Sequence, residues 1–98
     1  MTKKVSLWVN DQSIDLDYFA ADFIDHTVGG MLGALKGTGE IGTLKLSLND
    51  GEISLDLNNA QVPVNIFVSD IIRNTVTGMI STLKGVGKIN SLKIAIER

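Results

Sequence analysis

One histidine stands close to acidic residues in a stretch with helical periodicity. His26 is the only histidine, with Asp22 four residues before it and Asp25 directly before it. Residues four apart share a helix face, so Asp22 and His26 are candidates for metal binding or acid–base chemistry. A metal needs at least a third protein ligand, and Asp70 and Asn74, 48 positions further on, do not repeat the pair. We therefore interpret it as a surface pair and predict no metal and no catalytic site.

Two glycine-containing segments share their composition with phosphate-binding loops. They are residues 36–39 (Lys-Gly-Thr-Gly) and 84–87 (Lys-Gly-Val-Gly). A phosphate loop lies between a strand and a helix N-terminus, where free N–H groups face the anion. These segments follow predicted helices, at the end where free carbonyl oxygens point outward and the helix dipole is negative. We therefore interpret them as helix C-caps and turns.

Acidic residues concentrate in the first half of the chain. Residues 3–50 carry four lysines and seven acidic residues (−3), whereas residues 51–98 carry five basic and four acidic residues (+1). Neither half has the basic face of a nucleic-acid-binding protein, so we predict no nucleic-acid partner. Acid–base catalysis needs carboxylates of contrasting environment in one cleft, which the pattern does not indicate. Four aspartates are interpreted as a solvated face, open to a basic partner or a divalent ion: Asp15, Asp17, Asp22 and Asp25.

A single tryptophan lies on the polar side of the first predicted strand. Trp8 alternates with Val5, Leu7 and Val9, and the residue 48 positions later is Asp56, so no core position demands an aromatic there. Tryptophan is enriched among the residues that dominate protein interfaces. The indole could also be half covered by lysine stems. We predict Trp8 as a contact residue for a partner or ligand.

Composition excludes several classes of function. The chain has no cysteine, which removes disulfides and thiol chemistry. With one histidine and no nucleophile–base motif, we expect no enzyme and no cofactor. No signal-type apolar stretch and no membrane-spanning run occurs in the sequence. We therefore expect a soluble, cytoplasmic protein without membrane contact.

The sequence repeats itself with a period of 48 residues. When residues 3–50 are laid on residues 51–98 without gaps, 17 of the 48 pairs are identical. Caps, turn residues and the phase of apolar residues recur together, which shared low complexity would not produce. We predict one domain, residues 1–98, built from two tandem repeats, 3–50 and 51–98. Two copies are too few for a solenoid, so we expect an internal pseudo-two-fold axis.

Each repeat reads strand, strand, helix, strand. Alternating apolar residues predict the strands, and Asn10-Asp11, Asn58-Asn59 and Asp50-Gly51 predict two-residue hairpin turns between them. The expected register pairs Leu7 with Ile14 and Leu48 with Ile53. The last strand should pair with the first.

The helices are predicted at roughly 18–36 and 66–84. Asp17 and Asn65 are suitable N-caps, and Gly37 and Gly85 are expected C-caps after lysines at 36 and 84. The apolar arc of the first helix spans roughly 200°, wider than packing on one sheet needs. Small residues on one side of each helix, including Gly30 and Gly78, favour close helix–helix packing.

Two architectures satisfy these elements. The preferred one is an α+β fold with six mainly antiparallel strands in one sheet and both helices packed on one face. The alternative is a closed six-stranded barrel, because the element order of each repeat resembles the halves of a double-psi barrel. The long predicted helices depart from that family, whose helices are short.

Two functional hypotheses follow. The first is a non-enzymatic protein-interaction or assembly module that contacts a protein partner or a second copy through Trp8 or the unused helix arc. The alternative is a small-ligand-binding protein with a pocket between the helices, since pockets form at such junctions. The predicted lining of that pocket is Gly30, Met31, Gly78 and Met79.

Overall fold

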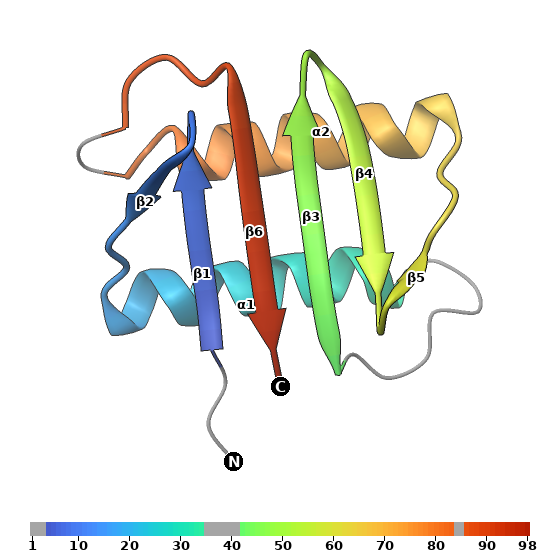
Figure 1. Cartoon of the computed structure of the whole chain (residues 1–98), viewed down its shortest axis with the longest axis horizontal. Helices are drawn as coiled ribbons and strands as arrows, with labels where there is room; N and C mark the ends of the chain where they lie inside the picture. The colour runs from blue at the N-terminus through green and yellow to red at the C-terminus, as the bar shows by residue number, and fades with distance from the viewer. Residues whose placement is uncertain (1–3, 35–41, 84–85) are drawn as a thin grey trace.

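The computed structural model describes residues 4–34, 42–83 and 86–98, which form six strands and two helices. All six strands belong to one antiparallel sheet with the order β2-β1-β6-β3-β4-β5, and both helices cross the same face of it (Figure 1). In chain order the elements are β1 (Lys4–Val9), β2 (Gln12–Ile14), α1 (Tyr18–Gly33), β3 (Thr43–Asn49), β4 (Glu52–Leu57), β5 (Ala60–Gln61), α2 (Ile66–Ile80) and β6 (Ser91–Glu97).

The predicted α+β class is confirmed, and the barrel alternative is wrong. In the described residues, β2 and β5 lie at opposite edges of the sheet and do not pair, so the sheet is open. Closing a barrel requires its edge strands to pair along their length. Here they have three and two residues, and Pro63, shortly after β5, has no N–H to donate.

The three predicted hairpin turns are present. Both central residues of each turn have positive φ, between 51° and 80°, as a type I′ turn requires. The register is also as predicted, with Leu7 opposite Ile14 and Leu48 opposite Ile53. The turns are Asn10-Asp11, Asp50-Gly51 and Asn58-Asn59.

The centre of the sheet is formed by the strands that end each half of the chain. β6 pairs with β1, as predicted for the last and first strands, and also with β3. Leu46 of β3 lies directly opposite Ile94 of β6. Strands far apart in sequence therefore share one hydrogen-bonded layer.

Both helices begin where the sequence predicts and end earlier. The side chains of Asp17 and Asn65 accept hydrogen bonds from the backbone N–H groups of Ala20 (2.7 Å) and Val68 (2.8 Å), which confirms both N-caps. The predicted helix ends at 36 and 84 are wrong, because α1 stops at Gly33 and α2 at Ile80.

Side-chain hydroxyls account for the early end of α2. Ser81 Oγ donates to the Gly78 carbonyl (2.9 Å) and Thr82 Oγ1 donates to the Met79 carbonyl (2.7 Å). These donors satisfy carbonyl oxygens of the last turn without a glycine cap. The predicted C-caps, Gly37 and Gly85, lie outside the described residues.

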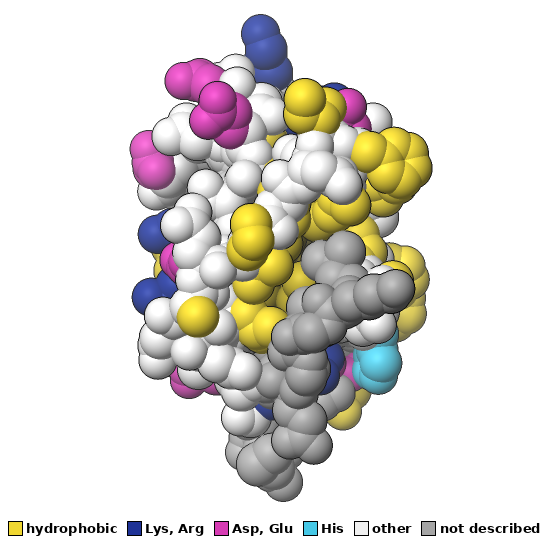
Figure 2. Space-filling model, turned by 90° about the vertical axis from the view of Figure 1, so that its right-hand side faces the viewer, with side chains coloured by type: hydrophobic (Ala, Val, Ile, Leu, Met, Phe, Trp, Pro, Cys, Tyr) yellow, Lys and Arg dark blue, Asp and Glu magenta, His cyan; other side chains and the backbone are white. Residues whose placement is uncertain are grey.

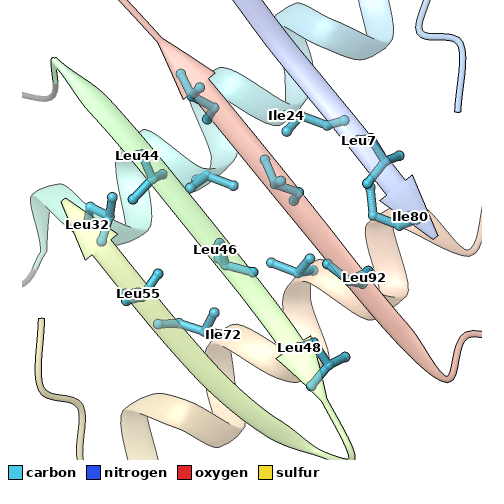
Figure 3. Packing of buried hydrophobic residues seen from close by; sticks show 14 of the residues in the cluster. Leu7, Ile24, Leu32, Leu44, Leu46, Leu48, Leu55, Ile72, Ile80 and Leu92 are labelled. Carbon is cyan, nitrogen blue, oxygen red and sulfur yellow. The ribbon is translucent and has the colours of Figure 1, made fainter. Parts of the chain in front are cut away.

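The core fills the layer between the sheet and the helices (Figure 3). Ile24 and Val28 of α1 and Ile72 and Val76 of α2 are buried against the inward strand residues. Full burial of each such side chain contributes about 1.5–3 kcal/mol to stability. The inward strand residues with 3% exposure or less are Leu7, Leu44, Leu46, Leu55, Leu92, Ile94 and Ile96.

The predicted close packing of the helices at their glycines is not observed. A Cβ atom added at Gly30 or Gly78 would meet no heavy atom within 4 Å. The helices run in opposite directions over the sheet (Figure 1), and both anchor on strands rather than on each other. None of the helices in the described residues is long and apolar enough to cross a membrane.

Candidate functional site

Both helices expose large hydrophobic side chains. Phe19 of α1 is 73% exposed and Phe67 of α2 is 69% exposed. Figure 2 shows hydrophobic side chains gathered on the side of the molecule formed by the helices. We call the exposed surface of α1 and α2 the helix face. Its large apolar residues are Tyr18, Phe19, Phe23, Ile66, Phe67 and Ile71.

Helix geometry explains how the same helix can bury one apolar side and expose another. Ile24 and Val28 are four residues apart and face the sheet, whereas Phe19 and Phe23 form a second pair four apart on the outer side. The two phenyl rings lie 5.8 Å apart between centroids at an interplanar angle of 41°. The predicted wide apolar arc therefore has an outer part that the sheet does not cover.

An apolar pocket lies between the start of α1 and the end of α2. Its volume is about 520 Å³. Phe19, Phe23 and Thr27 line it from α1, whereas Thr75 and Met79 line it from α2. Because aromatic and aliphatic groups dominate the lining, the pocket suits an apolar guest.

The four residues predicted to line a pocket between the helices have different surroundings. Met79 lines the pocket of 520 Å³. Met31 is partly buried against the core. Gly30 and Gly78 are exposed on the helix face, with open space at their Cβ positions.

Trp8 lies on the strand face that the helices do not cover. It is partly buried, and Lys93 Nζ of the neighbouring β6 lies 5.5 Å from its ring centroid, within cation–π range. A shallow hollow of about 280 Å³ beside it is lined by Trp8, Asp11, Ser47 and Lys93, among others. The surrounding strand residues are mostly Ser, Lys, Asp and Glu, so this face is polar apart from the indole.

The Asp22–His26 pair is present on the surface of α1. His26 Nδ1 lies 3.5 Å from Asp22 Oδ2 and 2.9 Å from the Asp22 carbonyl oxygen. Together with Asp25, these residues could each offer one metal-ligand atom within 4.8 Å of the others. The Asp25 carboxylate, however, is bound by Arg98.

The prediction that four aspartates form a solvated face is wrong for Asp25. It is fully buried, and Arg98 Nε and Nη2 each lie 3.0 Å from its Oδ1 atom. Arg98 Nη2 also donates to the Asp25 carbonyl (3.3 Å). Gly29 leaves room for the guanidinium, because a Cβ there would lie 2.6 Å from Arg98 Nη2.

Sequence reasoning missed this ion pair because its partners are 73 residues apart and meet only through the path of β6. The available signal was the helical phase of Asp25, which places it one turn from Val28 and two turns from Leu32 on the buried side.

Comparisons with known proteins do not assign this site. No protein-family model matches the chain, and neither the curated proteins nor the solved structures contain a match to it.

Proposed function

We propose that this chain is a non-enzymatic protein-interaction module and that its contact surface is the helix face. The observation that carries the proposal is the exposed area of the six large apolar side chains there. At roughly 150–250 Å² for a full side chain of this kind, their exposed fractions leave between roughly 600 and 1,000 Å² open to water. About half of this area lies at the start of α1 and half at the start of α2, so each of the two groups is comparable to the largest apolar patch of an ordinary monomer, about 300–600 Å².

The other surfaces support association less well. Strand pairing between molecules needs long, flat sheet edges, and the edge strands β2 and β5 have three and two residues. The open strand face is polar around Trp8, whose ring already contacts Lys93. Contact through Trp8 on the strand face is therefore a less favoured alternative to contact through the helix face.

We further propose that the two halves, 3–50 and 51–98, are duplicated β-β-α-β units of a single domain, related by a pseudo-two-fold axis between β3 and β6. Equivalent hydrogen bonds in the two halves support the duplication. Asn10 Oδ1 accepts from the N–H groups of Asn90 and Ser91. Asn58 Oδ1, 48 positions later, accepts from those of Gly42 and Thr43. The exposed apolar residues of the helices are also spaced by 48, so duplication would give the helix face an approximate two-fold symmetry.

Photo-crosslinking tests the proposed surface. p-Benzoylphenylalanine at position 67 or 71 should give protein adducts on illumination in the cells that make this protein. The same group at position 54 or 56, on the open strand face, should give none. Adducts from the strand face alone would contradict the proposal.

A second candidate function is the binding of a small apolar ligand in the pocket between the helices. Its volume of about 520 Å³ lies in the range of about 300–1,000 Å³ typical of ligand pockets. Native mass spectrometry of gently purified protein would then show added mass. Thr75→Trp, in the pocket lining, should abolish that mass, whereas Ser54→Trp on the strand face should retain it.

A further inference from the structure

On the helix face, the size of the exposed side chains decreases from the N-terminal to the C-terminal end of each helix. The N-terminal halves carry large exposed residues, Phe19 and Phe23 on α1 and Phe67 and Ile71 on α2. The C-terminal halves carry small ones. In α1 these are Gly30 and Gly33, with Ala34 directly after the helix, and in α2 it is Gly78, with Ser81 and Thr82 directly after the helix. Each helix is therefore raised at its start and low at its end.

The antiparallel course of the helices turns this relief into a pattern. The raised start of α1 lies beside the low end of α2 (Figure 1), and residues of both line the same pocket. The helix face thus has two raised corners on one diagonal and two low corners on the other. When a second copy is turned by 180° about an axis parallel to the helices and faces the first, its raised corners lie over the low corners of the first copy.

We infer that a second copy of this chain covers the helix face, with the raised ends of its helices seated on the low ends of the first copy's helices. This inference rests on the proposed function and names its partner. Phe19 and Phe23 of each copy would lie over the end of α2 of the other, around Gly78 and Thr82. The contact is the same from both sides, so two copies close the assembly.

The available area fits this partner. A stable protein interface buries about 800 Å² on each side, which the exposed apolar area of roughly 600–1,000 Å² matches. A smaller guest in the pocket alone would leave Phe67 and Ile71 in water, because neither residue lines that pocket.

Charge favours the axis parallel to the helices. This axis lays α1 of each copy over α2 of the other, whereas the perpendicular axis lays α1 over α1. On its exposed surface α1 carries Asp22 and no lysine or arginine, since Asp25 is buried against Arg98, whereas α2 carries Arg73 beside Asp70. Placing α1 over α2 avoids bringing two acidic helices together.

The second copy also gives a reason for the exposed glycines. A glycine within an exposed helix costs about 1 kcal/mol relative to alanine. Within one copy, an added Cβ at Gly30, Gly33 or Gly78 meets nothing within 4 Å, so crowding inside the chain does not require glycine there. Aromatic rings of a second copy would require it.

Sedimentation equilibrium of the purified full chain, with two variants on opposite sides of the proposed contact, tests the inference. The wild type should sediment at twice its 10.5 kDa mass. Phe19→Asp removes a large apolar side chain from a raised end, and Gly78→Leu adds a large side chain at a low end. Each should raise the dimer dissociation constant at least about 30-fold, as loss of an interface hot spot does. Trp8→Ala, the matched control on the strand face, should leave it within about twofold.

Gly78→Leu is the decisive variant, because it adds apolar surface and helix propensity. Contact that depended on apolar area alone would be strengthened, whereas the proposed packing is blocked by the added volume. Urea denaturation of each variant shows whether the monomer still folds.

The outcomes separate this inference from the proposed function. A wild type that stays monomeric, while crosslinks from position 67 reach other proteins, overturns the second copy and keeps the interaction surface. A dimer weakened by Phe19→Asp but not by Gly78→Leu overturns the packing of raised on low ends. A dimer lost only in Trp8→Ala overturns this inference and the helix face as the contact surface, and moves the contact to the strand face around Trp8.

Discussion

The two helices have equivalent N-caps, buried sides and exposed apolar residues, but they are held to the sheet differently. In α1, the buried Asp25 carboxylate is bound by Arg98. In α2, the residue 48 positions later is Arg73, which contacts Asp70 at 3.2 Å on the surface and the Gly51 carbonyl oxygen at 3.5 Å. α2 shows that such a helix can pack on the sheet without a buried ion pair, through its apolar underside and the partly exposed contacts of Arg73. The ion pair of α1 is therefore an addition that fixes this helix to the residue after β6.

The largest difference between the helices should appear when each arginine is removed. Arg98→Ala should lower the free energy of unfolding by about 3 kcal/mol, because a carboxylate with 1% exposure loses its guanidinium. Arg73→Ala should cost less than about 1 kcal/mol, because both groups of its ion pair are substantially exposed. Urea denaturation of the two variants measures both values.

A double variant tests whether the unpaired Asp25 carboxylate causes the loss of stability in Arg98→Ala. Asp25→Leu combined with Arg98→Ala removes both charges and should be more stable than Arg98→Ala alone. Equal losses for Arg98→Ala and Arg73→Ala would mean that the buried pair does not distinguish the two helices.

Local chemistry made much of this fold predictable. The positive φ values at Asn10-Asp11 and Asn58-Asn59 follow from residue types that tolerate them. Strand register follows from alternation, because a slip of one residue would turn every apolar side chain outward. N-caps depend on one side chain and the next turn of the helix.

Features that depend on several segments were not predictable in the same way. The end of α2 depends on competition between the Ser81 and Thr82 hydroxyls and the next helical turn. The wide apolar arc of α1 is visible in the sequence and predicts a second contact surface, but the sequence left open whether this surface meets the other helix or a partner. Whether such an arc meets a neighbouring helix or water depends on helix spacing over the sheet, which periodicity does not encode. The pairing of Asp25 with Arg98 depends on the same long-range placement.

Removing the N-cap of either helix should lower the free energy of unfolding by the same amount. Asp17→Ala and Asn65→Ala each remove one side-chain acceptor from a backbone N–H in the first turn. Each variant should lose about 1 kcal/mol of unfolding free energy, measured by urea denaturation. Asp17→Asn keeps the acceptor and should stay within about 0.5 kcal/mol of wild type. A loss confined to one helix would indicate that the other cap contributes nothing in solution.

The smallest expected effects are at two adjacent glycines of α1, and their signs should differ. Alanine at Gly30 enters open space and should raise the free energy of unfolding by about 0.5–1 kcal/mol, because alanine loses less backbone entropy on folding. Alanine at Gly29 gains the same propensity, but its Cβ would lie 2.6 Å from Arg98 Nη2. The guanidinium must then move away from Asp25, so this variant should show no gain or a net loss.

Association must be separated from these two measurements. Both glycine variants are therefore made in the Phe19→Asp background, which is expected to be monomeric, and compared by urea denaturation. In the Arg98→Ala background the Cβ at position 29 no longer meets a guanidinium, so Gly29→Ala should there become as stabilising as Gly30→Ala. If Gly29→Ala stabilises equally with and without Arg98, the guanidinium does not rest on this turn of α1, and Gly29 is not required for the ion pair that distinguishes the two helices.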